Sequence, residues 1–128
     1  MNKQESQQIK KILQKTKRDK EVIAVLIFGS SLKNKYYKDI DICLVLNKKH
    51  SNLKIYEKRL NLLKELPDNF DIQIFQQLPI YIKIEILKEM KILLCKDYDS
   101  LYEIAFQTIK EFDDFKEIYE NYIKNALK

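Results

Sequence analysis

Glycine is almost absent from this chain. One glycine, Gly29, and two prolines, Pro67 and Pro79, stand among 128 residues, whereas average usage would supply about nine glycines at this length. There are also no internal repeats, low-complexity tracts or linkers. A chain that avoids glycine elsewhere keeps one for a backbone reason: either φ is positive there, or another group approaches the main chain closely.

Histidine and cysteine are too few for several kinds of site. His50 is the only histidine, so a histidine-based triad or a histidine-rich metal site has little to build from. We expect it in a solvated loop beside Lys48 and Lys49. Cys43 and Cys95 lie in apolar runs without the CxxC or Cys–His spacing of zinc sites, which predicts buried, reduced thiols.

Long apolar runs are missing as well. No stretch approaches the roughly 18 uninterrupted apolar residues of a membrane span, and the first six residues lack the apolar core of a signal peptide. We therefore expect a cytoplasmic protein without a membrane partner. A content of 45% hydrophobic and 34% charged residues is typical of globular chains, and one domain over residues 1–128 is the natural expectation.

The net charge of +5 comes almost entirely from lysine, since Arg18 and Arg59 are the only arginines. A modest positive field favours encounters with polyphosphates or nucleic acids. The lysines are spread along the chain rather than clustered, which argues against nucleic acid as the partner.

Hydrophobic periodicity predicts alternating helices and strands. The expected helices cover residues 4–19, 53–66, 79–90 and 100–127, and the last begins at a capping-box pattern of Ser100 and Glu103. The expected strands cover residues 21–28, 39–46, 70–75 and 92–95. This order predicts an α/β or α+β domain with a small mixed sheet flanked by helices. A final helix of about 40 Å exceeds a small domain's diameter, so its far end needs something to pack on.

Two aspartates are set at strand spacing in Asp39-Ile40-Asp41-Ile42. Alternation puts both carboxylates on one face, about 6.5–7 Å apart along the strand, and Asp71 near the start of another strand is the candidate for a third. Nucleotidyl transfer uses two divalent metals, for which carboxylates are natural ligands. We therefore predict Asp39, Asp41 and Asp71 as catalytic residues that bind two Mg²⁺ ions. Two alternatives are a solvated strand end for the pair and a simple strand start for Asp71.

The turn Gly29-Ser30-Ser31 ends the first strand. Glycine would let the backbone approach a triphosphate, the following N–H groups would donate to phosphate oxygens, and Ser30 would add a hydroxyl. A plain tight turn without a ligand is the alternative. Three lysines follow that are placed to neutralise phosphate charge, and the sequence does not say which one does: Lys33, Lys35 and Lys38. We predict Gly29, Ser30, Ser31 and Lys33 as nucleotide-binding.

These residues carry a resemblance. Phe28-Gly29-Ser30, Asp39-Ile40-Asp41-Ile42 and Asp71 resemble the polymerase-β-type nucleotidyltransferase superfamily, and more narrowly the minimal nucleotidyltransferases of prokaryotes. The ending around Phe112-Asp113-Asp114-Phe115 is similar too, so the resemblance covers most of the chain. Eight residues separate Ser30 from Asp39, fewer than in most members, and they lack the usual arginine and second glycine.

The resemblance implies a polymerase-β-like fold and transfer of AMP from ATP. Asp39 and Asp41 would bind both metals, and Asp71 would bind the catalytic metal and orient or deprotonate the acceptor hydroxyl. Many minimal nucleotidyltransferases are encoded beside a HEPN-domain protein, a small helical ribonuclease toxin. The implied role is that of an antitoxin which adenylylates a tyrosine of that toxin, with self-modification also open. The C-terminal helix would suit such a partner or a homodimer.

Two other functions stay open at this stage. The shortened segment between Ser30 and Asp39 fits a catalytically weak or inactive module that binds a nucleotide or neutralises a partner by contact. A nucleic-acid-binding module has only Lys35-Tyr36-Tyr37-Lys38 as local support, where aromatic side chains alternate with basic ones. Tyr36 and Tyr37 would stack on a base or pack on their own domain.

Overall fold

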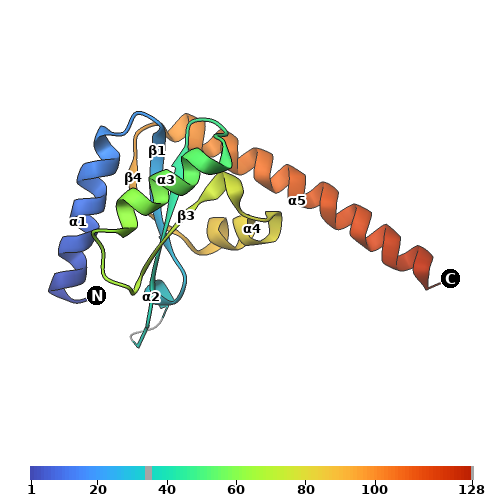
Figure 1. The fold of residues 1–128 in the computed structure, drawn as a ribbon. Coiled ribbons are helices and arrows are strands. Elements are labelled where there is room, and N and C mark those ends of the chain that lie inside the picture. The colour runs from blue at the N-terminus through green and yellow to red at the C-terminus, as the bar shows by residue number, and fades with distance from the viewer. Residues whose placement is uncertain (34–35, 128) are drawn as a thin grey trace.

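The computed structural model describes residues 1–33 and 36–127. Within them, a four-stranded sheet has the order β3–β2–β1–β4 (Figure 1). β1 (Val22–Phe28) pairs antiparallel with both β2 (Ile40–Leu46) and β4 (Lys91–Cys95), while β3 (Phe70–Ile74) runs parallel to β2. The predicted mixed sheet is confirmed.

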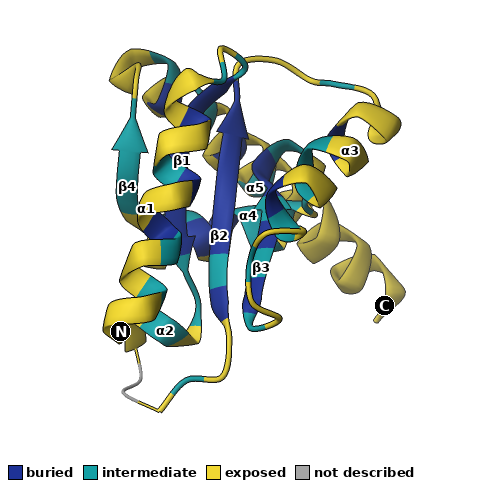
Figure 2. Ribbon diagram, turned by 60° about the vertical axis from the view of Figure 1, so that its left-hand side comes forward, coloured by how far each residue is buried: buried dark blue, intermediate teal, exposed yellow. Residues whose placement is uncertain are grey.

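Helices cover both faces of this sheet (Figures 1 and 2). The order of elements along the chain is α1 (Lys3–Arg18), β1, α2 (Ser30–Lys33), β2, α3 (Asn52–Leu63), β3, the short 3-10 helix η1 (Phe75–Gln77), α4 (Ile80–Glu89), β4 and α5 (Tyr98–Ala126). On one face, Ile12 of α1 and Ile55 of α3 join a buried cluster with Val25 and Ile42. On the other, Phe75, Ile86 and Leu101 from η1, α4 and α5 pack with Leu26 and Cys43.

This two-sided cover explains the unbroken apolar run of β1. Residues 22–27 are all buried, because their side chains alternate between two apolar layers and neither direction meets water. The expectation of a strand covered on both faces is confirmed. Cys43 is buried and Cys95 is half-buried, and both thiols are free.

Most expected boundaries differ from the structure by one to three residues, and two of these differences have a clear reason or bear on the site. α5 begins at Tyr98 rather than at Ser100, because the Asp97 side chain is its N-cap and accepts a hydrogen bond from the Ser100 N–H at 3.1 Å. An aspartate is as good an N-cap as serine, so the Ser100–Glu103 pattern lies inside the helix. β2 begins at Ile40, which leaves Asp39 immediately before the strand.

The second half of α5 extends away from the sheet (Figure 1). Residues 113–127 are all exposed, as expected for a helix longer than the domain it packs on. Among the described residues, no helix is both long and apolar enough to cross a bilayer.

Candidate active site

Gly29 joins β1 to α2 and has φ at +83°. The first expected reason for a glycine at this position, a positive φ, is therefore confirmed. The second reason holds as well. A Cβ built at Gly29 would lie 2.4 Å from Oδ2 of Asp41, far inside van der Waals contact. Asp41 is opposite Phe28 in the β1–β2 register, and its carboxylate occupies the space that a side chain at Gly29 would fill.

The three predicted aspartates meet at this same end of the sheet. Asp41 of β2 is the direct register partner of Asp71 in β3, and Asp39 stands two residues before Asp41. Asp39 is exposed, whereas Asp41 and Asp71 are half-buried. Burial raises the pKa of Asp41 above its ordinary value, and the negative charges of Asp71 and Asp39 raise that pKa further.

Two residues that the sequence analysis missed hold Asp71. Gln73 Nε2 donates a hydrogen bond of 2.8 Å to Asp71 Oδ2. Arg59 Nη2 of α3 lies 3.8 Å from Asp71 Oδ1, and Arg59 Nε donates to the Ile72 carbonyl at 2.6 Å. Gln73 could have been found from strand alternation, since it shares a face with Asp71. No local pattern marks Arg59.

The predicted phosphate-binding residues differ in their surroundings. Ser30 opens α2 directly after Gly29, the residue that the Asp41 carboxylate approaches. The Ser31 hydroxyl oxygen is buried and finds no hydrogen-bond partner among the described residues. The Lys33 ammonium, by contrast, forms an ion pair with Glu89 at the end of α4. Lys35 lies outside the described residues.

Tyr37 contributes to the fold rather than to a stacking surface. Its hydroxyl donates a hydrogen bond of 2.7 Å to Glu5 Oε1 of α1, and its ring packs against the core on the α1 face. Of the two alternatives given for Tyr37, the structure shows packing on its own domain.

The donor set suits a hard divalent cation. Neither Asp39 nor Asp41 forms an ion pair with a lysine or arginine among the described residues, so their negative charge is uncompensated. Carboxylate oxygens are the ligands that Mg²⁺ prefers. Among the described residues, no three acidic, histidine or cysteine side chains are grouped closely enough to hold a metal. Asp71 accepts the hydrogen bond from Gln73 in this arrangement.

Two hollows of the described surface lie elsewhere. One of about 400 Å³ lies between α1 and α3, and one of about 570 Å³ lies between the start of β1, η1 and α5. Neither is lined by Gly29 or by any of the three aspartates. The aspartates lie at one end of β2 and β3, where Asp39 is exposed and Asp41 and Asp71 are half-buried.

A mixed sheet that sets a Gly-Ser turn beside an Asp-x-Asp strand and a third aspartate defines a nucleotidyltransferase. The comparisons agree. Residues 7–99 match the family model described as Polymerase beta, Nucleotidyltransferase, and the chain belongs to this family of enzymes.

Several known proteins are similar to this chain. MJ1547 of Methanocaldococcus jannaschii, named as a proposed protein adenylyltransferase, is 39% identical over 103 residues, which cover 78% of each chain. A chain from the complex of a tri-AMPylated Shewanella oneidensis HEPN toxin with an MNT antitoxin superposes with a TM-score of 0.70 and 19% identity, covering 96% of this chain and 98% of that one. A chain from a toxin–antitoxin structure with AMP-PNP has a TM-score of 0.70 and 18% identity, covering 95% and 98%. At these identities the solved structures establish the fold.

Proposed function

We propose that residues 1–128 form one Mg²⁺-dependent nucleotidyltransferase domain that transfers AMP from ATP to a protein hydroxyl. A tyrosine of a partner HEPN-domain toxin is the acceptor we favour, which makes the protein an antitoxin. The observation that carries the proposal is the pairing of Asp41 with Asp71, next to Asp39, against the backbone of Gly29. The name of the Methanocaldococcus relative and the AMPylated toxin in the Shewanella complex support the choice of reaction and partner.

The proposed reaction assigns a task to each residue. Asp39, Asp41 and Asp71 hold two Mg²⁺ ions, which neutralise phosphate charge and activate the acceptor when bound. The N–H groups after Gly29 and the hydroxyls of Ser30 and Ser31 hold the β- and γ-phosphates.

The chemical step is a substitution at phosphorus. The acceptor oxygen bonds to the α-phosphorus of ATP, and the bond from that phosphorus to the bridging oxygen of the β-phosphate breaks. Pyrophosphate leaves, and Asp71 takes the hydroxyl proton. The Gln73 hydrogen bond holds Asp71 Oδ2, and the longer 3.8 Å contact of Arg59 with Oδ1 leaves Oδ1 the less tightly held of the two oxygens.

One observation favours a second candidate function. Lys33, which we predicted to bind phosphate, is already paired with Glu89, and the segment between Ser30 and Asp39 is short. A module that binds nucleotide weakly, and neutralises its partner by contact without turnover, would have these features.

The test uses the purified full chain, labelled ATP, Mg²⁺ and the product of the adjacent gene, which we expect to be a HEPN-domain protein. We expect label on the HEPN-domain protein, at a tyrosine located by mass spectrometry, together with pyrophosphate release. Asp41→Asn is the matched control, since it keeps the size of the side chain and removes its charge. Nucleotide binding without pyrophosphate release would support the contact-only module. Equal label transfer by wild type and Asp41→Asn would exclude the proposed site.

A further inference from the structure

The outer half of α5, residues 112–126, carries an apolar stripe that the described part of its own chain leaves uncovered. Earlier in the same helix, Leu101 and Thr108 are buried against the sheet layer. Further along, Phe115, Tyr119 and Tyr122 are 49%, 56% and 69% exposed. Figure 1 shows this half projecting beyond the rest of the molecule. Exposed apolar surface of this extent marks an interaction site.

The spacing of the stripe indicates what kind of surface covers it. Steps of four and three residues alternate without interruption along the helix: Leu101, Ala105, Thr108, Phe112, Phe115, Tyr119, Tyr122 and Ala126. This is the heptad spacing of helices packed on helices. The first half of the pattern packs on the protein itself, and the second half continues the same pattern into solvent. The missing surface is therefore helical.

The width of the stripe indicates more than one helix. Ile118 and Ile123 lie on either side of the heptad positions and are 69% and 39% exposed. A narrow stripe suffices for a pair of helices, whereas flanking isoleucines broaden the apolar face to the width that a groove between two helices covers.

The charge beside the stripe selects the partner. Residues 111–126 contain five acidic residues and two lysines. Over its whole length α5 has seven acidic residues and three lysines, a net charge of −4, against +5 for the whole chain, so the remainder carries +9. Two α5 helices side by side would bring acidic flanks together, whereas a groove with basic rims would complement them.

We propose that residues 112–126 of α5 form a docking helix for a helical protein whose apolar groove is rimmed by lysine or arginine. In the setting of the proposed function, on which this assignment rests, the occupant is the HEPN-domain acceptor. Docking on α5 is separate from chemistry at the aspartates, so it needs neither ATP nor Mg²⁺.

Calorimetric titration of the full chain with the neighbouring HEPN-domain protein, in chelator and without ATP, tests the proposal. The double variant Ile118→Asp/Tyr122→Asp adds two negative charges, one in the stripe and one on its flank. Lys124→Asp changes the charge by the same amount on the opposite side of the helix and is the matched control. We expect the double variant to bind at least roughly a hundredfold more weakly and Lys124→Asp to bind like the wild type. Wild-type binding should also weaken when salt rises from about 0.05 to 0.5 M, because the acidic flanks are screened.

Three outcomes would overturn the proposal. Binding that the double variant leaves unchanged excludes the stripe, and a wild-type chain that forms no complex excludes this occupant. A dimer of the chain alone, seen by light scattering and lost in the double variant, would assign the stripe to a second copy. Circular dichroism checks that the variant keeps its helices. Pyrophosphate release from Mg-ATP, measured on the same samples, reports separately on the proposed enzymatic activity.

Discussion

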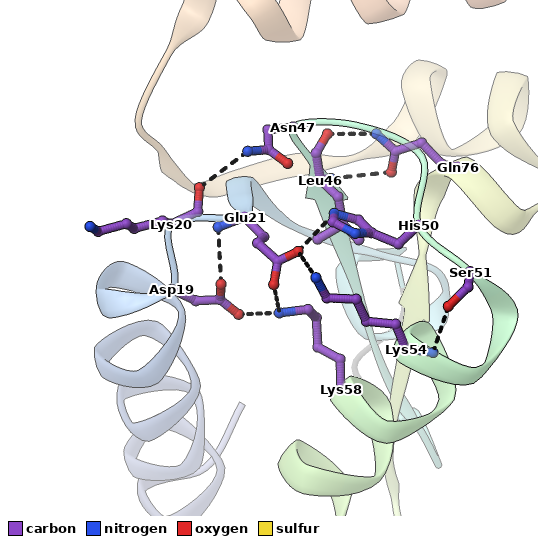
Figure 3. A network of polar contacts seen from close by, with 10 residues as sticks. All are labelled: Asp19, Lys20, Glu21, Leu46, Asn47, His50, Ser51, Lys54, Lys58 and Gln76. Carbon is purple, nitrogen blue, oxygen red and sulfur yellow. Dashed lines mark hydrogen bonds and ion pairs between the residues drawn. The ribbon is translucent and has the colours of Figure 1, made fainter.

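The two ends of the β1–β2 pair place carboxylates in opposite electrostatic surroundings. At one end, Asp39, Asp41 and Asp71 face one another, and the pKa of Asp41 is raised by its burial and by the other two charges. At the other end, Asp19 and Glu21 precede β1 and meet lysines from α3 (Figure 3). Among the described residues, Asp39 and Asp41 have no lysine or arginine partner and Asp71 has only Arg59, at 3.8 Å, whereas Asp19 and Glu21 are both paired with lysines.

The second end is a compensated network. Lys58, only 14% exposed, forms an ion pair with Asp19 and lies 3.6 Å from Glu21 Oε1. Lys54 Nζ and His50 Nε2 each lie 2.9 Å from Glu21 Oε2. Burial alone would raise the pKa of Asp19, but hydrogen bonds from Lys58 and the Glu21 N–H lower it below its ordinary value. The contact with Lys54 lowers the pKa of Glu21, against a smaller effect of burial.

The difference separates carboxylates that stabilise a fold from carboxylates kept for a ligand. Carboxylates paired with lysines contribute to stability and need no bound cation. Clustered carboxylates repel one another and destabilise the protein until a cation binds between them. This contrast predicts opposite outcomes for substitutions at the two ends. Activity should be lost at the aspartate cluster, and stability should be lost at the lysine network.

The largest effect is expected from Asp41→Asn. AMP transfer should fall at least roughly a hundredfold, about 2.7 kcal/mol of transition-state stabilisation, because a metal-binding carboxylate is lost. The melting temperature should stay the same or rise, since Asp71 and Asp39 no longer repel a neighbouring charge. Label transfer and differential scanning calorimetry measure the two quantities. A variant that melts well below the wild type would show that Asp41 serves the fold.

Gly29→Ala should reduce both the stability of the protein and its AMP transfer. The residue sits at φ +83°, and its new Cβ would meet Asp41 Oδ2 at 2.4 Å. Strain of this kind costs about 1–3 kcal/mol, and the displaced carboxylate should also reduce AMP transfer.

A double-mutant cycle isolates the close approach from the backbone strain. Asp41→Ala removes the oxygen that the new Cβ would meet, so Gly29→Ala should cost less in that background than in the wild type. Urea denaturation measures each free energy of unfolding. Strictly additive effects would show that φ alone requires the glycine.

Lys58→Met tests the compensated end. We expect a loss of about 1–2 kcal/mol in the free energy of unfolding, because Asp19 keeps its partial burial and loses its main partner. AMP transfer should be unchanged. Lys54→Met is the matched control, since Lys54 is 51% exposed and exposed ion pairs contribute about 0–1 kcal/mol. Equal losses from the two variants would contradict the importance we assign to burial here.

Much of this arrangement follows from local pattern. Alternation places Asp39 and Asp41 on one face, and the apolar run of β1 requires cover on both sides. A lone glycine between strand and helix requires an unusual backbone or a close neighbour, and Gly29 has both. Each of these inferences depends on residues within a few positions of one another, where the geometry of a strand or turn is fixed.

Contacts between distant elements could not be predicted in this way. Arg59 reaches Asp71 only because α3 crosses the sheet beside β3, and Lys33 meets Glu89 only because α2 and α4 end close together. His50 is the plainest error: its side chain is 4% exposed rather than solvated. Nothing beside it in the sequence marks the partner, Glu21, which lies on the far side of a strand pairing.

The smallest effect is a difference in pH dependence between the two ends. The pKa of Asp41 is raised above its ordinary 3.8, so its contribution is favourable at low pH and is lost as pH rises through the raised pKa. The pKa of Asp19 is lowered below 3.8, so its contribution is present above that value and is lost as pH falls. Urea denaturation between about pH 3 and pH 8 should show that the free energy of unfolding of Asp41→Asn increases relative to that of the wild type as pH rises. The deficit of Lys58→Met should shrink as pH falls below 3.8 toward the lowered pKa of Asp19, because a protonated Asp19 needs no partner. Parallel curves for all three proteins would mean that the two ends do not differ electrostatically.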